Sequence, residues 1–386
     1  MTETTSTGPT RPARPAPPAS APTPAVPTSS APTAAAPARP HASDTTTPDP
    51  PAPLTTDILG EPWVARRIDV VPDEDAAPGA DHAVLVHQRG AIPAVPIAPA
   101  AGTAGTPRHK RAVLYLHGRN DYFFQTHLAD AFLSAGYEFY ALDLRTCGRA
   151  GVGHPSPHDV RDLRVHDEEI GEALRIIRSE HGHDVVVLNG HSTGGLQAVI
   201  WAADHPGTVD AVVLNSPWLD LRGSALVRSY GSAIVDLISR RDPERVIDEP
   251  GRGEKDNYVE ALHRRWRGEW DWDLALKPAP SFPVRAGFLA GIRRLQREVH
   301  HGLGIRVPIL VCCSTASGGV KAGLEEAQRS DVVLDVDQII DRSQYLGDDV
   351  TVRQIPDGVH DLALSGPPAR AEYLQAVTHW LDNRLH

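Results

Sequence analysis

From residue 111 onward, short apolar runs alternate with longer stretches of helical character. Apolar runs that predict buried strands lie at 112–116, 137–144, 185–188, 211–214 and 307–311. Helical stretches lie between them, as at 163–179 and 196–204. Parallel strands are buried on both faces and need a crossover connection, which is usually a helix. The alternation therefore predicts a mostly parallel central sheet flanked by helices, which is an α/β doubly wound fold.

Three further strands and a helix complete the predicted fold. Alternating patterns at 65–71 and 82–87 predict an antiparallel hairpin at one edge. The apolar run at 350–355 predicts the last strand, and the segment 369–385 predicts an amphipathic closing helix.

Two parts of the chain depart from this rhythm. Residues 1–55 hold 15 of the 35 prolines, mixed with Ala and Thr, and offer few large apolar side chains, so we expect a disordered tail. Between 217 and 304 no strand-like run appears, which predicts an inserted, mostly helical lid. Open α/β sheets bind ligands at their carboxyl edge, where such an insertion would lie. The lid would divide the core into 56–216 and 305–386.

The most specific motif is Gly-His-Ser-Thr-Gly at 190–194, between an apolar strand and a helix. A serine on a tight strand-to-helix turn needs small neighbours, and the two glycines of this G-x-S-x-G pattern provide them. The pattern predicts that Ser192 is a nucleophile presented at the edge of the sheet. Amides at the start of the following helix would stabilise a developing oxyanion.

A serine hydroxyl needs a base to remove its proton, and His360 is placed to act as that base. His360 follows the predicted last strand in the segment IPDGVHDLAL and precedes the closing helix. Histidines such as His117, His154 and His166 precede the serine, against the chain order of serine, acid and histidine.

The acid that orients His360 is expected after the strand at 307–311, but a glycine-rich stretch intervenes. Asp331, Asp335 and Asp337 all remain candidates. Asp331 comes first after the stretch and is preferred, with Asp335 next. A helix N-cap is the alternative role for Asp331.

The loop after the first core strand should complete the oxyanion hole. His117-Gly118 ends this strand, and glycine lets the backbone approach the acyl oxygen closely. The expected donors are the amides of Arg119 and Thr193. The aromatic residues Tyr122 and Phe123 are candidates for an acyl pocket, although aromatic residues that start a helix often belong to the core.

Composition narrows the remaining functions. The net charge of −11 argues against nucleic-acid partners, and no apolar run reaches the length of a membrane-spanning helix. No nucleotide-binding or metal-binding motif is found, so no metal or cofactor is expected. The three cysteines, Cys147, Cys312 and Cys313, are expected to be reduced in a cytoplasmic protein. The expected partner is a small acyl substrate, and the oligomeric state stays open.

From about residue 65 to its end, the chain resembles the monoacylglycerol lipase, lysophospholipase and serine-aminopeptidase-like branch of the α/β-hydrolases. The resemblance lies in LYLHGRNDYFF, GHSTGG, and SDVVLDVDQI with GVHDLAL. It implies the α/β-hydrolase fold and the acid role of Asp331, and it matches Arg119 and Thr193 as oxyanion donors. Two features differ from the branch: the segment at 143–150 replaces the usual D-x-R-G-H-G-x-S, and the stretch before Asp331 is longer than usual.

Three functions are compatible with these residues. Hydrolysis of a carboxylic ester, such as a monoacylglycerol, a lysophospholipid or a small ester, is the leading hypothesis. An aminopeptidase would need acidic groups near the pocket, and Glu269, Asp271 and Asp273 are candidates for them. A partner-binding protein on a hydrolase scaffold is the non-enzymatic alternative.

Overall fold

The computed structural model describes residues 53–75, 77–89, 109–222, 225–248, 256–319 and 322–385. The predicted disordered tail lies outside these ranges, apart from its last residues. Among the helices of the described ranges, none has both the length and the apolar character needed to cross a membrane.

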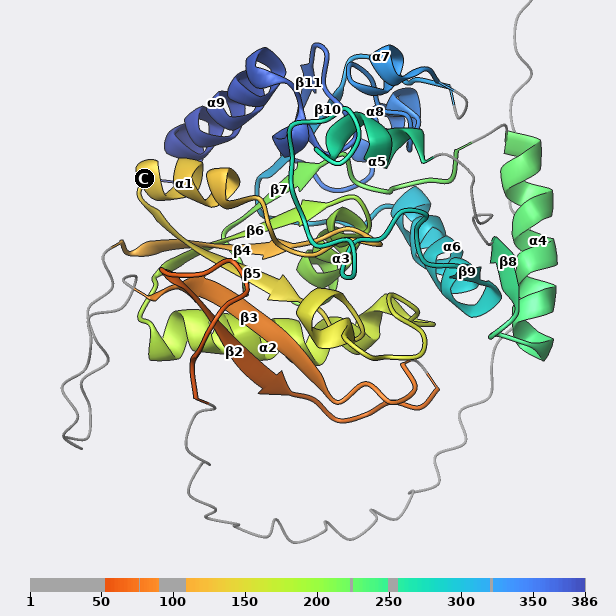
Figure 1. Cartoon of the computed structure of the whole chain (residues 1–386), viewed down its shortest axis with the longest axis horizontal. Coiled ribbons are helices and arrows are strands. Elements are labelled where there is room, and N and C mark those ends of the chain that lie inside the picture. The colour runs from red at the N-terminus through yellow and green to blue at the C-terminus, as the bar shows by residue number, and fades with distance from the viewer. Residues whose placement is uncertain are drawn as a thin grey trace, which may run out of the picture. The chain divides into compact units, whose positions relative to one another are not determined.

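A nine-stranded sheet forms the centre of the fold (Figure 1). Its strands are β1 (Thr55–Thr56), β2 (Trp63–Asp69), β3 (His82–Gln88), β4 (Arg111–Leu116), β5 (Tyr137–Asp143), β6 (Val185–His191), β7 (Ala211–Asn215), β10 (Ile309–Ser314) and β11 (Val350–Ile355). Their order is β1-β2-β3-β5-β4-β6-β7-β10-β11. The pairs from β5 to β11 are parallel, and β1, β2 and β3 pair antiparallel at one edge. The predicted doubly wound sheet with an antiparallel edge hairpin is confirmed.

Helices cover both faces of this sheet. The helices of the described ranges are α1 (Thr126–Ser134), α2 (Asp167–Arg175), α3 (Thr193–Asp204), α4 (Ala225–Arg241), α5 (Asn257–Leu262), α6 (Ala286–His301), α7 (Leu324–Ala327), α8 (Val336–Ser343) and α9 (Pro367–Arg384). In Figure 1, α1 and α9 lie on one side of the sheet and α2 on the other. The predicted helix at 163–179 is present, but a 3₁₀ turn precedes α2 and a π turn follows it.

The core strands are mostly apolar because their side chains contribute to two hydrophobic clusters, one on each face of the sheet. In β6, Val186 and Leu188 pack against the face that carries α2, α3 and α6, while Val187 packs against the face that carries α1 and α9. Successive side chains of a strand point to opposite faces, so a strand covered on both sides has no polar positions to alternate with.

The segment predicted as an insertion, 217–304, holds α4, α5, α6 and a small antiparallel pair, β8 (Val246–Asp248) with β9 (Val284–Arg285). Its last helix is part of the core, because Phe288, Ile292 and Leu295 of α6 join the cluster that contains α2 and α3. The sequence analysis placed α6 in the insertion, since no strand-like run separates it from the preceding residues. The part outside the core therefore ends before α6.

Three histidines surround one tyrosine at the antiparallel edge of the core. The hydroxyl of Tyr140 lies 2.8 Å from His181 Nδ1 and 2.8 Å from His183 Nε2, and the ring of His87 packs against Tyr140 and His181. All three imidazoles are buried. Burial lowers the pKa of His87 and of His183 to about 4, and that of His181 to about 3. The cluster is therefore neutral in the folded protein near pH 7.

We expect the protein to lose stability as the pH falls from about 6.5 to about 4. In that interval the unfolded chain protonates these histidines, whose usual pKa is about 6.5, while the folded chain does not, so protonation favours unfolding. Urea denaturation across this pH range measures the effect. His87→Phe should flatten the pH dependence, while His379→Gln on the exposed face of α9 should leave it unchanged. An equally steep dependence in His87→Phe would contradict the assignment.

Candidate active site

Ser192 lies at the sharp turn between β6 and α3, with φ of 53° and ψ of −115°. Positive φ is strained for a residue with a side chain, so the surrounding structure must enforce it. Gly194 and Gly195 make this possible: a Cβ at Gly194 would overlap the carbonyl oxygens at the end of β4, and one at Gly195 would lie 2.7 Å from Pro217 Cβ. The start of α3 therefore lies directly against neighbouring strand ends, and the turn projects Ser192 away from the sheet.

The structure brings the three predicted residues Ser192, His360 and Asp331 together. His360 Nε2 lies 3.0 Å from Ser192 Oγ, and His360 Nδ1 lies 2.9 Å from Asp331 Oδ2. The carboxylate accepts a hydrogen bond from the Nδ1–H group, which leaves Nε2 unprotonated and able to accept the proton of the serine hydroxyl. All three side chains are buried, and Asp331 is fully so. This arrangement is able to activate the serine hydroxyl as a nucleophile.

Asp331 reaches this position although it lies well beyond the end of β10. The glycine-rich stretch turns back on itself: the Asp331 amide donates to Ala316 O, and the Gly318 amide donates to Asp331 O. Burial raises the pKa of Asp331, but the electrostatic interaction and hydrogen bond with His360, together with the hydrogen bonds donated by the Val333 and Leu334 amides, outweigh burial and lower this pKa overall. Asp331 is therefore held as a carboxylate.

The other two candidate acids lie elsewhere. Asp335 is the N-cap of α8, where its side chain accepts the amide of Asp337 at 3.2 Å. The side chain of Asp337 is exposed. The N-cap that the sequence analysis considered for Asp331 is thus provided by Asp335.

The loop after β4 lies close to the nucleophile, as the sequence analysis expected. A Cβ on Gly118 would lie 3.1 Å from Ser192 Cβ, so only glycine allows this approach without displacing the serine. Arg119 and Thr193, the expected oxyanion donors, line the same cavity as Ser192 and His360.

The cavity beside Ser192 has a volume of about 430 Å³. Part of its wall comes from the 217–304 segment, with the side chains of Trp218, Tyr258, Lys277 and Val284. No periodic pattern in the sequence assigns these residues to the site. Lys277 also pairs with Asp121, at 2.7 Å between Nζ and Oδ1, and both side chains are buried. This ion pair joins the insertion to the loop that follows β4.

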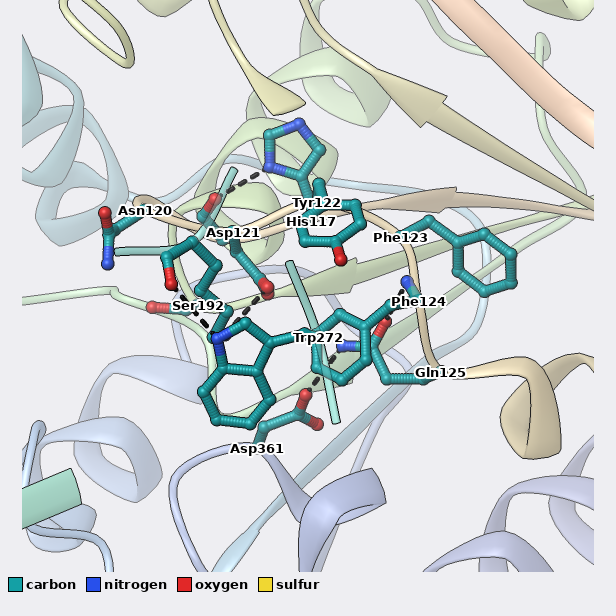
Figure 2. Close-up of polar contacts among 12 residues, drawn as sticks. His117, Asn120, Asp121, Tyr122, Phe123, Phe124, Gln125, Ser192, Trp272 and Asp361 are labelled. Atoms are coloured by element: carbon teal, nitrogen blue, oxygen red, sulfur yellow. Dashed lines mark hydrogen bonds and ion pairs between the residues drawn. The ribbon is translucent and has the colours of Figure 1, made fainter. Parts of the chain in front are cut away.

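The two aromatic residues predicted to line an acyl pocket do not line this cavity. The ring of Phe123 packs against Trp63 and Phe139 in the core, and Figure 2 shows it directed away from Ser192. Tyr122 is buried as well, and its hydroxyl accepts the Asp273 amide at 2.8 Å. The loop turns both rings toward apolar surroundings, which is the alternative that their sequence position left open.

Asn215, at the end of β7, connects the two halves of the site, and sequence reasoning missed it. Its backbone oxygen accepts the Ser192 amide at 3.0 Å. Its side chain donates to Asp361 Oδ1 at 2.8 Å and accepts the Leu362 amide at 3.1 Å. Gln125 donates to the other oxygen of Asp361 (Figure 2). A polar residue that ends the apolar run AVVLN was the available signal.

Comparison with known proteins identifies the family to which this fold belongs. A family model described as serine aminopeptidase, S33, matches residues 107–362, which is more than half of the chain. A monoacylglycerol lipase of Mycolicibacterium smegmatis is 34% identical over 91 residues, which make up 24% of this chain and 31% of that protein. The chain thus matches about a third of that relative's length.

Solved structures share the fold at low sequence identity. A soluble variant of the monoglyceride lipase of Saccharomyces cerevisiae superimposes with a TM-score of 0.57 and 15% identity, over 82% of this chain and 96% of that one. A carboxyl esterase of Bacillus coagulans gives a TM-score of 0.55 and 13% identity, over 83% and 99%. Together with the extent of the family match, the sheet order identifies the chain as a member of the serine aminopeptidase S33 family of α/β-hydrolases.

Proposed function

We propose that this protein is a serine hydrolase that cleaves a carboxylic ester through an acyl-enzyme, with Ser192, His360 and Asp331 as its catalytic triad. The observation that carries the proposal is the continuous hydrogen-bonded chain from Ser192 Oγ through the His360 imidazole to Asp331. Each member is buried at a cavity wall or directly behind it, so the triad is largely shielded from bulk water.

The reaction follows from the position of the protons. Ser192 Oγ attacks the acyl carbon while His360 Nε2 accepts its proton, and Asp331 stabilises the imidazolium that forms. The amides of Arg119 and Thr193 donate to the carbonyl oxygen as it becomes negative. His360 then protonates the leaving alcohol, and a water molecule releases the acyl group by the reverse sequence of proton transfers.

The substrate class is proposed from the cavity and from the relatives. A volume of about 430 Å³ falls within the range of cavities that enclose a small ligand. Relatives and fold neighbours include monoacylglycerol lipases and an esterase, so a monoacylglycerol, lysophospholipid or small ester is the first candidate.

An aminopeptidase is the second candidate, because the matching family model carries that description. The lid carboxylates suggested by the sequence do not support it. Glu269 pairs with Arg370, Asp271 pairs with Arg264, and neither these two nor Asp273 lines the cavity. Asp256, which does line it, is the carboxylate that would bind a substrate amine.

We also propose that the part of 217–304 outside the core acts as a lid. Besides the Lys277–Asp121 pair, this part contacts the oxyanion loop, which is the loop after β4 that carries Arg119. The Arg119 side chain donates to Phe282 O and Pro283 O at 2.9 and 2.6 Å. Asn120 donates to Pro278 O at 3.0 Å. Movement of this segment would therefore change both the access to Ser192 and the position of the oxyanion loop.

Substitutions of the three triad residues should lower the hydrolytic activity to different extents. Ser192→Ala should abolish labelling by a fluorophosphonate, because the variant lacks the hydroxyl that reacts with the reagent. On a p-nitrophenyl ester, His360→Ala should lower kcat by about 10⁶-fold and Asp331→Asn by about 10⁴-fold. Asp335→Asn is the matched control and should retain activity, because Asp335 caps α8. Labelling of Ser192→Ala at the wild-type rate would rule out the assigned nucleophile.

The two substrate classes are separated by kinetics. We expect kcat/KM for short p-nitrophenyl esters to exceed that for aminoacyl anilides by at least about 100-fold, which corresponds to about 2.7 kcal/mol of transition-state free energy. Asp256→Asn should leave the ester reaction nearly unchanged. A preference for anilides that Asp256→Asn removes would instead favour the aminopeptidase.

Asn215 is predicted to be a positioning residue. Asn215→Ala keeps the backbone oxygen that binds the elbow, which is the turn between β6 and α3 that carries Ser192. It removes the side chain that connects this elbow to the loop of His360. We expect kcat to fall by about 10- to 100-fold with little change in KM, because only the alignment of serine and imidazole is lost. Asn383→Ala on the exposed face of α9 serves as the control. An unchanged kcat, or a rise in KM alone, would contradict this role.

A further inference from the structure

A second, smaller cavity lies behind the oxyanion loop. Its volume is about 30 Å³, and Arg119 and Thr193 line both this cavity and the one beside Ser192. His158 and Gln197 line the smaller cavity but not the one beside Ser192, and apolar groups such as Leu144 form much of the remaining wall. Five separate parts of the chain therefore meet behind the two proposed oxyanion donors.

This cavity gathers an unusual number of unsatisfied polar atoms. Arg119 Nε, His158 Nε2, Thr193 Oγ1 and both amide atoms of Gln197 are buried, and none has a hydrogen-bond partner within the part of the chain that the structure describes. Buried polar atoms are nearly always hydrogen-bonded, because an unsatisfied one loses its hydration without compensation. Their convergence on one cavity indicates that they share a ligand.

The protonation of these groups defines that ligand. The Asn120 amide donates to His158 Nδ1 at 3.2 Å, so a neutral His158 carries its proton on Nε2. Burial lowers the pKa of His158 well below its usual value and keeps the ring neutral. His158 Nε2 and Arg119 Nε are thus donors, while Thr193 Oγ1 and Gln197 Oε1 are able to accept. A cation would face the two donors, whereas a water molecule is able to accept from the donors and to donate to the acceptors.

We propose that this cavity binds an ordered water molecule that accepts from His158 Nε2 and Arg119 Nε and donates to Gln197 Oε1 and Thr193 Oγ1. A water needs about 10 to 15 Å³ of such space and two to four polar partners, and the site provides both. The water would tie together the side chains of Arg119 and Thr193, whose amides are the proposed oxyanion donors. Gln197 is then a positioning residue for the oxyanion hole, a role that rests on the proposed hydrolase function.

A high-resolution crystal structure of the full chain, grown with sodium bromide in place of sodium chloride, tests the site itself. The expected result is density for one water within hydrogen-bond distance of Gln197 and His158, without anomalous signal. An anomalous bromide peak, a cavity without density, or direct hydrogen bonds between Gln197 and the other three side chains would overturn the proposal. This measurement does not depend on any activity of the protein.

The functional role is tested with Gln197→Leu, which keeps the approximate volume but removes both amide atoms. We expect kcat on a p-nitrophenyl ester to fall about tenfold with KM unchanged. The affinity for an alkyl boronic acid should fall by a similar factor, because its adduct with Ser192 places an oxygen in the oxyanion hole. Gln375→Leu, on the exposed face of α9, is the matched control and should behave like the wild type.

Other outcomes separate the two proposals. Wild-type kcat and boronate affinity in Gln197→Leu, or a change in KM alone, would overturn the positioning role. If Gln197→Leu does not fold, Thr193→Val, which keeps the oxyanion amide, replaces it with the same expected losses. If the wild-type protein neither reacts with a fluorophosphonate nor hydrolyses an ester, the proposed function fails, while the crystal structure still decides whether the water is present.

Discussion

The start of α3 lies so close to the end of β4 that the backbone between β6 and α3 is forced through a left-handed turn at Ser192. Only glycine fits at positions 194 and 195, because carbonyl oxygens of β4 and the ring of Pro217 occupy the space of a side chain. The packing of two core strands against a helix thus supports the strained residue, which would not hold this conformation alone. The position of Ser192 Oγ relative to the other two residues of the proposed triad therefore depends on this packing.

The imidazole is brought to the same point by a different route. His360 lies on a loop after β11, which β7 and β10 separate from β6 in the sheet, and loops of this kind are usually the more mobile parts of a fold. Here, the residues that follow His360 are bound by Asn215 and Gln125 through Asp361. Asn215 also binds the Ser192 amide, so one residue at the end of β7 fixes the loop and the elbow relative to each other.

The sequence predicted what depends on regular patterns. Alternating apolar runs identified the strands, and their order after the elbow was enough to select Ser192 and His360. Asp331 needed a family resemblance as well, because the stretch after β10 hides how it returns to the strand end. Helix α6 was assigned to the insertion since the boundary between helices has no periodic signal. Phe123 and Tyr122 were placed in a pocket because residue type does not reveal which way a loop turns its side chains. The partners of Asn215 and Lys277 are distant in sequence, and only packing brings them together.

The backbone contacts between Asp331 and residues 316–318 hold the acid beside the end of β10. These contacts lie next to β10, so the position of the acid does not depend on the length of the loop between Gly318 and Asp331. Lengthening such a loop adds only a small closure entropy. An insertion in this loop would therefore change the surface of the protein while the charge behind His360 stays where it is.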